Sequence, residues 1–154
     1  ESVLEQNVQE TEIAGWSYHQ NDAYKFFYGT WEFARLIYED ESVKGEDNES
    51  ILGEQVMYSP TEDECGETRI DNPNYAMTIL PIDDEFVNIL LPDRDFAVWV
   101  ELANASEFYS GENLLLKDDN TMYCFTNDCV YELVRISHME GYEDGYCLKY
   151  HERW

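Results

Sequence analysis

The sequence predicts one all-β domain: an antiparallel, eight-stranded barrel (roughly eight strands, as in small closed barrels) with a short N-terminal helix. Three observations support this fold class. Aromatic residues make up 15% of the 154 residues, and such residues favour pleated, half-buried strands. Strand-like segments with short connections follow one another along most of the chain, which is typical of a barrel or a sandwich. Towards the C-terminus, three apolar segments separated by two tight turns predict a meander.

The order of elements divides the chain into three parts. Residues 1–22 form a peripheral segment, 23–136 the barrel domain, and 137–154 a C-terminal extension expected to pack on the barrel. Ser2-Val3-Leu4-Glu5 fits a capping box and predicts the N-terminal helix. The acidic segments 39–50 and around Cys65 predict exposed loops, and 83–91 predicts a loop or a short helical turn. Strands are expected at 29–38, 55–58, 68–70, 75–82, 96–102, 114–116, 121–125 and 130–136, with a further strand at 146–150 as an open alternative.

The charge is extreme. There are 34 acidic residues against 9 basic ones, so the formal net charge is −25. A chain this anionic repels phosphate backbones and anionic lipid surfaces, so nucleic acid is not an expected partner. The charge favours solubility, and attraction of cations or of a basic partner is the alternative.

The chain has no stretch near the roughly 20 apolar residues that span a bilayer. It begins at Glu1 rather than at Met. We therefore expect a removed signal peptide and a secreted or cell-surface location, and a lipid anchor upstream of residue 1 stays open.

Four cysteines are present, and an even number in an exported domain permits two disulfides. Cys124 and Cys129 flank the turn 126–128, where they could face each other across a hairpin. A Cys124–Cys129 bridge is possible, and four reduced, half-buried thiols are the alternative. The spacing does not match a zinc site, because no C-x-x-C pair occurs.

No catalytic motif is present. The chain lacks a G-x-S-x-G elbow and an H-E-x-x-H pair. The acidic turns 93–95, 118–120 and 127–128 are interpreted as ordinary turns, with cation binding as the alternative. We therefore expect a non-catalytic protein with no cofactor and no metal.

Two features near the ends of the predicted barrel resemble a known family. Gly29-Thr30-Trp31 opens the first strand, and Arg135 lies in the last strand of the meander. Lipocalins and fatty-acid-binding proteins have a similar G-x-W beside an arginine of the final strand, at the closed end of an antiparallel barrel. The resemblance covers about residues 24–136 and implies barrel closure by Gly29, Trp31 and Arg135. On physical grounds alone, the guanidinium can stack on the indole if the two strands meet; a plain surface charge at Arg135 is the alternative.

The leading functional expectation is an exported or cell-surface lipocalin-like module. It would bind a small apolar or amphipathic ligand in the barrel, or a protein partner on its surface. Inward residues of the long strands would line such a cup, and plain core packing is the alternative for them. The competing class is an acidic structural or interaction domain with a filled core. The candidate lining residues are Phe33, Tyr58, Met77 and Trp99.

Overall fold

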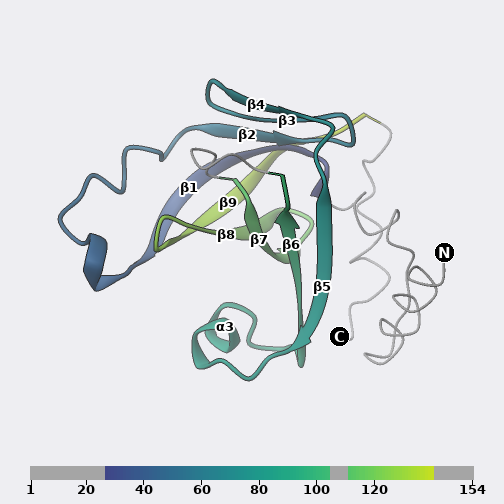
Figure 1. The fold of residues 1–154 in the computed structure, drawn as a ribbon. Helices are drawn as coiled ribbons and strands as arrows, with labels where there is room; N and C mark the ends of the chain where they lie inside the picture. Colours follow the sequence, from purple (N-terminus) through teal and green to yellow (C-terminus); the bar gives the residue numbers. More distant parts are fainter. Residues whose placement is uncertain (1–26, 105–110, 141–154) are drawn as a thin grey trace.

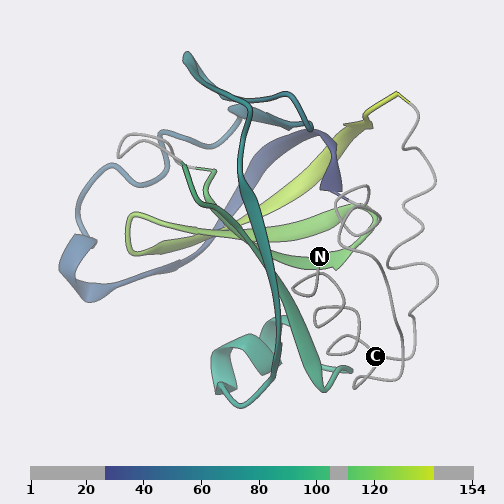
Figure 2. The ribbon, with the colours of Figure 1, turned by 45° about the vertical axis from the view of Figure 1, so that its right-hand side comes forward.

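The computed structural model describes residues 27–104 and 111–140. Nine antiparallel strands form one sheet in the order β4-β3-β2-β1-β9-β8-β7-β6-β5 (Figure 1). The first and last strands are neighbours at its centre, and the sheet curls into a half-barrel (Figure 2). The strands are β1 (Gly29–Glu39), β2 (Gln55–Tyr58), β3 (Glu62–Cys65), β4 (Thr68–Asp71), β5 (Tyr75–Pro81), β6 (Phe96–Leu102), β7 (Asn113–Asp118), β8 (Thr121–Thr126) and β9 (Cys129–His138).

The all-β prediction is confirmed, but the eight-stranded barrel differs from the nine strands observed. The additional strand is β3, whose acidic sequence Glu-Asp-Glu-Cys predicted a loop. Asp63 and Cys65 of β3 are buried, and pairing with both β2 and β4 holds the strand. The expected N-terminal helix within 1–22 and the alternative strand at 146–150 lie outside the described residues.

The curl of the sheet arises mainly along β1. The register between β1 and β9 shifts at three places, which marks bulges that bend and twist a strand. β4 and β5 stand at the two ends of the strand order, so no backbone ladder joins them. Instead, the Tyr75 hydroxyl at the start of β5 donates to the Ser59 carbonyl at 3.0 Å and to the buried Asp63 carboxylate. A side chain therefore links the edge strand β5 to β3, the strand next to the other edge.

The concave face of the sheet is filled by its own side chains. Both ends are covered as well: Phe27 packs at one end, and the β1–β2 loop brings Val43, Ile51 and Leu52 against the core. A short helical turn, η1 (Glu41–Val43), starts this loop, and Tyr131 holds it by donating to the Asn48 carbonyl at 2.7 Å. The loop was expected to be exposed, yet its few apolar residues close the core. Side chains with no exposed surface on this face include Phe27, Trp31, Phe33, Val56, Tyr58, Met122, Cys124 and Leu133.

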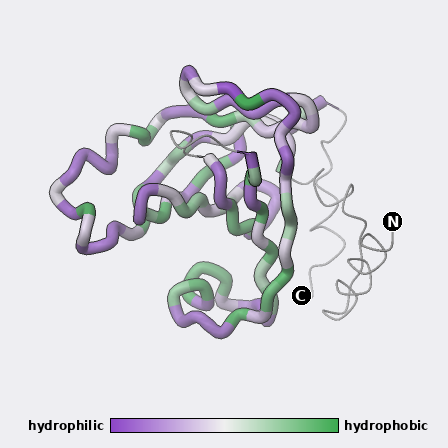
Figure 3. Tube along the Cα trace, viewed as in Figure 1, coloured by the Kyte–Doolittle hydropathy of each residue, from purple (hydrophilic) through white to green (hydrophobic). Residues whose placement is uncertain are grey.

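A second, smaller core lies on the opposite face of the sheet. The helix α3 (Glu85–Leu90) begins at Asp84, whose carboxylate accepts from the Phe86 amide at 2.8 Å. Figure 3 shows that much of this helix is hydrophobic. The helix thereby places Phe86 next to the end of β1 and the β8–β9 hairpin. The buried residues of this core are Val87, Leu90, Leu91, Ala97, Leu115, Tyr123 and Val130.

Candidate functional site

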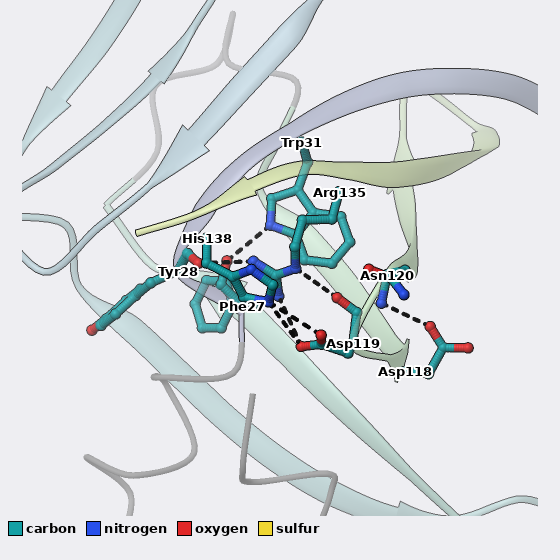
Figure 4. A network of polar contacts seen from close by, with 8 residues as sticks. All are labelled: Phe27, Tyr28, Trp31, Asp118, Asp119, Asn120, Arg135 and His138. Atoms are coloured by element: carbon teal, nitrogen blue, oxygen red, sulfur yellow. Dashed lines mark hydrogen bonds and ion pairs between the residues drawn. The ribbon is translucent and has the colours of Figure 1, made fainter. Parts of the chain in front are cut away.

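The predicted contact between Trp31 and Arg135 is present at one end of the half-barrel. Arg135 of β9 pairs in register with Trp31 of β1. Its guanidinium carbon lies 4.3 Å from the centre of the Trp31 ring (Figure 4). The indole Nε1 in turn donates to the Phe27 carbonyl at 2.9 Å. This geometry is a cation–π contact between β1 and β9, the first and last strands along the chain.

Further bonds hold the Arg135 side chain, which is only 2% exposed. Its Nε donates to the Asp119 carbonyl at 2.5 Å, and its Nη1 donates to the Tyr28 carbonyl at 3.0 Å. Burial lowers the pKa of Arg135 to about 10, opposed by the Asp119 carboxylate, so the group stays cationic at neutral pH. His138 lies at the rim, with Nε2 3.1 Å from an Asp119 carboxylate oxygen. The cluster joins β1, β9 and the β7–β8 turn, and its burial gives it a structural role.

Gly29 completes this closed end. Its φ is +137°, and an added Cβ would lie 2.3 Å from the Ser137 carbonyl oxygen on β9. No side chain fits at that distance, so the close approach of β1 and β9 requires glycine here. Both defined positions of the G-x-W pattern therefore have a physical reason: Gly29 allows the close approach of β9, and Trp31 contacts the Arg135 guanidinium.

Of the four residues expected to line a cup, three lie on the concave face and Trp99 does not. Phe33 and Tyr58 are fully buried in the concave core, and Met77 of β5 packs partly buried against it. The Tyr58 hydroxyl is already used, because it donates to the Gly111 carbonyl at 2.9 Å. Trp99 lies on the other face, with its ring 5.1 Å from that of Phe125. Strict alternation along β6 sends Val98 and Val100 inward and Trp99 outward, so its placement in the cup was wrong.

The possible disulfide between Cys124 and Cys129 is absent. The β8–β9 turn contains two residues, Asn127 and Asp128, rather than three. It therefore pairs Thr126 with Cys129 and Cys124 with Tyr131, so the two cysteines are not opposite each other. Both cysteines are buried, while Cys147 lies outside the described residues.

Because of the Cys124 thiol, the stability of the protein is expected to decrease with rising pH in the alkaline range. Its burial raises its pKa far above the ordinary value. The unfolded chain ionises this thiol above about pH 8.5, whereas the folded chain keeps it protonated. The free energy of unfolding is therefore unchanged by this group below that pH and falls as the pH rises above it. We expect the free energy of unfolding to fall by up to about 1.4 kcal/mol per pH unit from this group. Urea unfolding of wild type and Cys124→Val between neutral and alkaline pH measures the effect; equal pH slopes in the two proteins would contradict it.

An open pocket of about 580 Å³ lies beside the β8–β9 turn, and we call it the hairpin groove. The end of β1 contributes Tyr38 and Asp40, α3 contributes Phe86, and the hairpin contributes Phe125 and Asp128. The Tyr38 and Phe86 ring centres are 5.5 Å apart, and those of Phe86 and Phe125 are 6.4 Å apart. The Tyr38 ring is 46% exposed, so part of this aromatic wall faces solvent.

Carboxylates surround the aromatic wall of the groove. Asp40, Glu112 and Asp128 are among the described lining residues, which include no lysine or arginine. The Asp40 carboxylate accepts from the Ser42 hydroxyl at 2.7 Å and from the Ser42 amide at 3.1 Å. These bonds lower the pKa of Asp40, so it remains ionised. The groove is thus an acidic recess with an aromatic wall.

The backbone fixes the two acidic edges of the groove relative to each other. The Asp40 amide donates to the Asp128 carbonyl at 2.9 Å. Asn127 and Asp128 have φ values of 56° and 61°, the conformation of a type I′ hairpin turn. The Asn-Asp pair between two apolar strands was the local signal for this turn. The aromatic residues come from three distant segments, so sequence reasoning missed the groove.

Other site types find no support in the part of the chain that the structure describes. Within 27–104 and 111–140, no three or more His, Cys, Asp or Glu side chains are grouped to hold a metal ion. Over the same residues, none of the helices has the length and apolar character needed to cross a membrane.

Comparison with known proteins gives no relative: the chain matches no protein-family model, no curated protein and no solved structure. Its function must therefore be inferred from the core and the groove themselves.

Proposed function

We propose that the protein is a non-catalytic, acidic interaction domain that binds a basic protein partner on its surface. The observation that carries this proposal is the filled concave face of the sheet. Trp31, Phe33, Tyr58 and Leu133 have no exposed surface, and aromatic rings pack edge to face across the space a ligand would need. This favours the filled core over a cup for an apolar ligand.

The charge of the surface supports a basic partner. The formal net charge is −25, and the exposed basic side chains of the described residues already pair within the chain. Arg35 contacts Glu132 at 2.8 Å, Arg69 contacts Glu62 at 2.8 Å, and Lys44 contacts Glu41 at 3.2 Å. Most carboxylates of the described residues therefore have no lysine or arginine within ion-pair distance. A field of this sign attracts cationic surfaces and raises their association rate.

We also propose that the half-barrel is a lipocalin-like architecture put to this different use. Gly29 and Trp31 on the first strand meet Arg135 on the last strand at one end, in support of that proposal. The departures are the nine strands and the unpaired edges β4 and β5, with Tyr75 of β5 bonded to Asp63 of β3. A secreted or cell-surface location remains a prediction, tested by fractionating the cells that make the protein.

Binding and mass measurements test the proposed function. Native mass spectrometry of freshly purified protein should show the mass of the polypeptide alone. Calorimetry should detect binding of a Gly/Ser peptide that carries spaced arginines. Its affinity should fall at least about tenfold as ionic strength rises well above 0.1 M, where the screening length is roughly 10 Å or less. The same peptide with citrulline in place of arginine is the neutral control.

Two results would overturn the proposed function. One is a co-purified apolar molecule that a fatty acid displaces, because it would show that the concave face serves as a cup. The other is equal binding of the arginine and citrulline peptides at low salt, because charge would then play no part.

A further inference from the structure

The geometry points to the hairpin groove as the contact site, with an arginine side chain of the partner as its occupant. This inference rests on the proposed function and deepens it by naming where and how the partner is recognised. The groove measures about 580 Å³, within the range of roughly 300–1,000 Å³ of ordinary ligand pockets. A side chain inserted from an extended segment would therefore fit.

The aromatic wall supplies the first half of the recognition. Tyr38, Phe86 and Phe125 form a continuous row of rings, and the outermost ring is 46% exposed. Aromatic faces carry negative charge density and attract a cation held over them. The row is anchored below by Trp99, whose ring is 5.1 Å from that of Phe125. The wall is thus held in place before any partner arrives.

The carboxylates supply the second half. Asp40 and Asp128 stand on two edges that the Asp40–Asp128 backbone bond ties together. Asp40 is held ionised and oriented by Ser42, and Asp128 is fixed by the tight turn. Glu112 adds a third negative group to the lining. A cation seated on the rings would find carboxylates on its flanks without any rearrangement.

Arginine fits this pair of features better than other cations. Its planar guanidinium stacks on a ring and offers a fork of donors to a carboxylate at the same time. The ammonium of lysine can do only one of these with full geometry, because it is a compact point charge. The protein itself shows the arrangement at its closed end, where Arg135 lies 4.3 Å over Trp31 and also pairs with Asp119. A bare metal ion fits poorly, because among the described residues no three or more acidic, histidine or cysteine side chains are grouped closely enough to hold one.

Four variants of the intact protein test the inference. Tyr38→Leu removes the exposed ring but keeps apolar bulk. Tyr38→Phe keeps the ring and loses the hydroxyl, which donates to the Asp40 carboxylate at 3.4 Å. Asp128→Asn removes one charge in the groove and tolerates the positive φ of the turn. Glu67→Gln is the matched control, because it removes one charge from the exposed turn of another hairpin, β3–β4. Circular dichroism and thermal unfolding should show that all four remain folded.

Calorimetry with the arginine peptide should separate these variants. We expect Tyr38→Leu and Asp128→Asn each to weaken binding about five- to tenfold and Glu67→Gln to change it less than about twofold. Tyr38→Phe should weaken binding less than Tyr38→Leu does, because it keeps the ring and loses only the bond to Asp40. A lysine peptide of the same spacing should bind wild type more weakly than the arginine peptide does.

The possible failures are distinguishable. If wild type does not bind the arginine peptide, the proposed function fails together with the groove. If it binds but Glu67→Gln weakens binding as much as Asp128→Asn, the acidic surface acts diffusely, so the groove is refuted and the proposed function stands. If the lysine peptide binds as tightly as the arginine peptide, the stacking geometry is refuted.

Discussion

Replacing Arg135 with methionine is expected to lower the free energy of unfolding by about 2–4 kcal/mol. The variant loses the cation–π contact with Trp31 and two charged hydrogen bonds to the carbonyls of Asp119 and Tyr28. Each such bond contributes about 1.5–3 kcal/mol, but removal of a buried charge also relieves its desolvation, so the net loss is smaller than the sum. Urea unfolding followed by circular dichroism measures the change.

Arg35→Met is the matched control for this prediction. Arg35 lies on the same pair of strands and also has a carboxylate partner, Glu132, yet its side chain is 65% exposed. An exposed ion pair contributes at most about 1 kcal/mol, so this variant should be nearly as stable as wild type. Arg135→Lys should fall between the two, because lysine keeps the charge but cannot reach both carbonyls while it stacks. Equal losses for Arg35→Met and Arg135→Met would refute the buried network.

Strand positions were predictable where apolar residues alternate. The segments 55–58 and 96–102 coincide with β2 and β6, and the three-strand meander matches β7, β8 and β9. β3 was not predictable, because one of its two buried residues is an aspartate, whose carboxylate accepts from the hydroxyl of Tyr75 on another strand. Helix α3 was expected only as a loop or turn, since its apolar face finds its partners on four different strands.

Of the two candidate sites, only the contact between Trp31 and Arg135 was predictable from the sequence. Trp31 and Arg135 each carry a local signal, a large ring and an isolated charge among apolar neighbours, and these signals point to one contact. The hairpin groove has no such signal. Its rings belong to β1, α3 and β8, which the fold brings together through the curl of the sheet. The possible Cys124–Cys129 bridge fails because the hairpin register pairs Cys124 with Tyr131 and Cys129 with Thr126.

In the proposed function, the negative charge and the filled core both favour recognition on the outer surface. Under the proposed function, a curled sheet that fills its own concave face leaves its outer surface for recognition. The charge would then select among partners, because a surface of net negative charge repels acidic molecules and attracts basic ones. A recess with oriented carboxylates and exposed rings would give this general attraction a specific point of contact. In this proposal the charge controls encounter, and the groove geometry controls which cation is retained.

Gly29→Ala is expected to have the largest effect of any single methyl addition in this part of the chain. The new Cβ would lie 2.3 Å from the Ser137 carbonyl oxygen and 2.9 Å from Nη1 of Arg135. Relief requires β1 and β9 to separate, which would also withdraw Trp31 from the guanidinium. The strained φ of +137° adds to this cost. We expect a loss of at least about 3 kcal/mol in the free energy of unfolding, measured by urea unfolding.

Gly53→Ala separates the backbone contribution from the steric one. Gly53 also has a positive φ, +96°, but an added Cβ there meets nothing within 4 Å. This variant should lose only about 1–2 kcal/mol, the cost of a left-handed conformation for a residue with a side chain. If Gly29→Ala proves too unstable to purify, a Gly53→Ala protein that is soluble and unfolds cooperatively still distinguishes the two positions. Equal stability of the two variants would show that β9 does not press against Gly29, and the closed end would then need a different explanation.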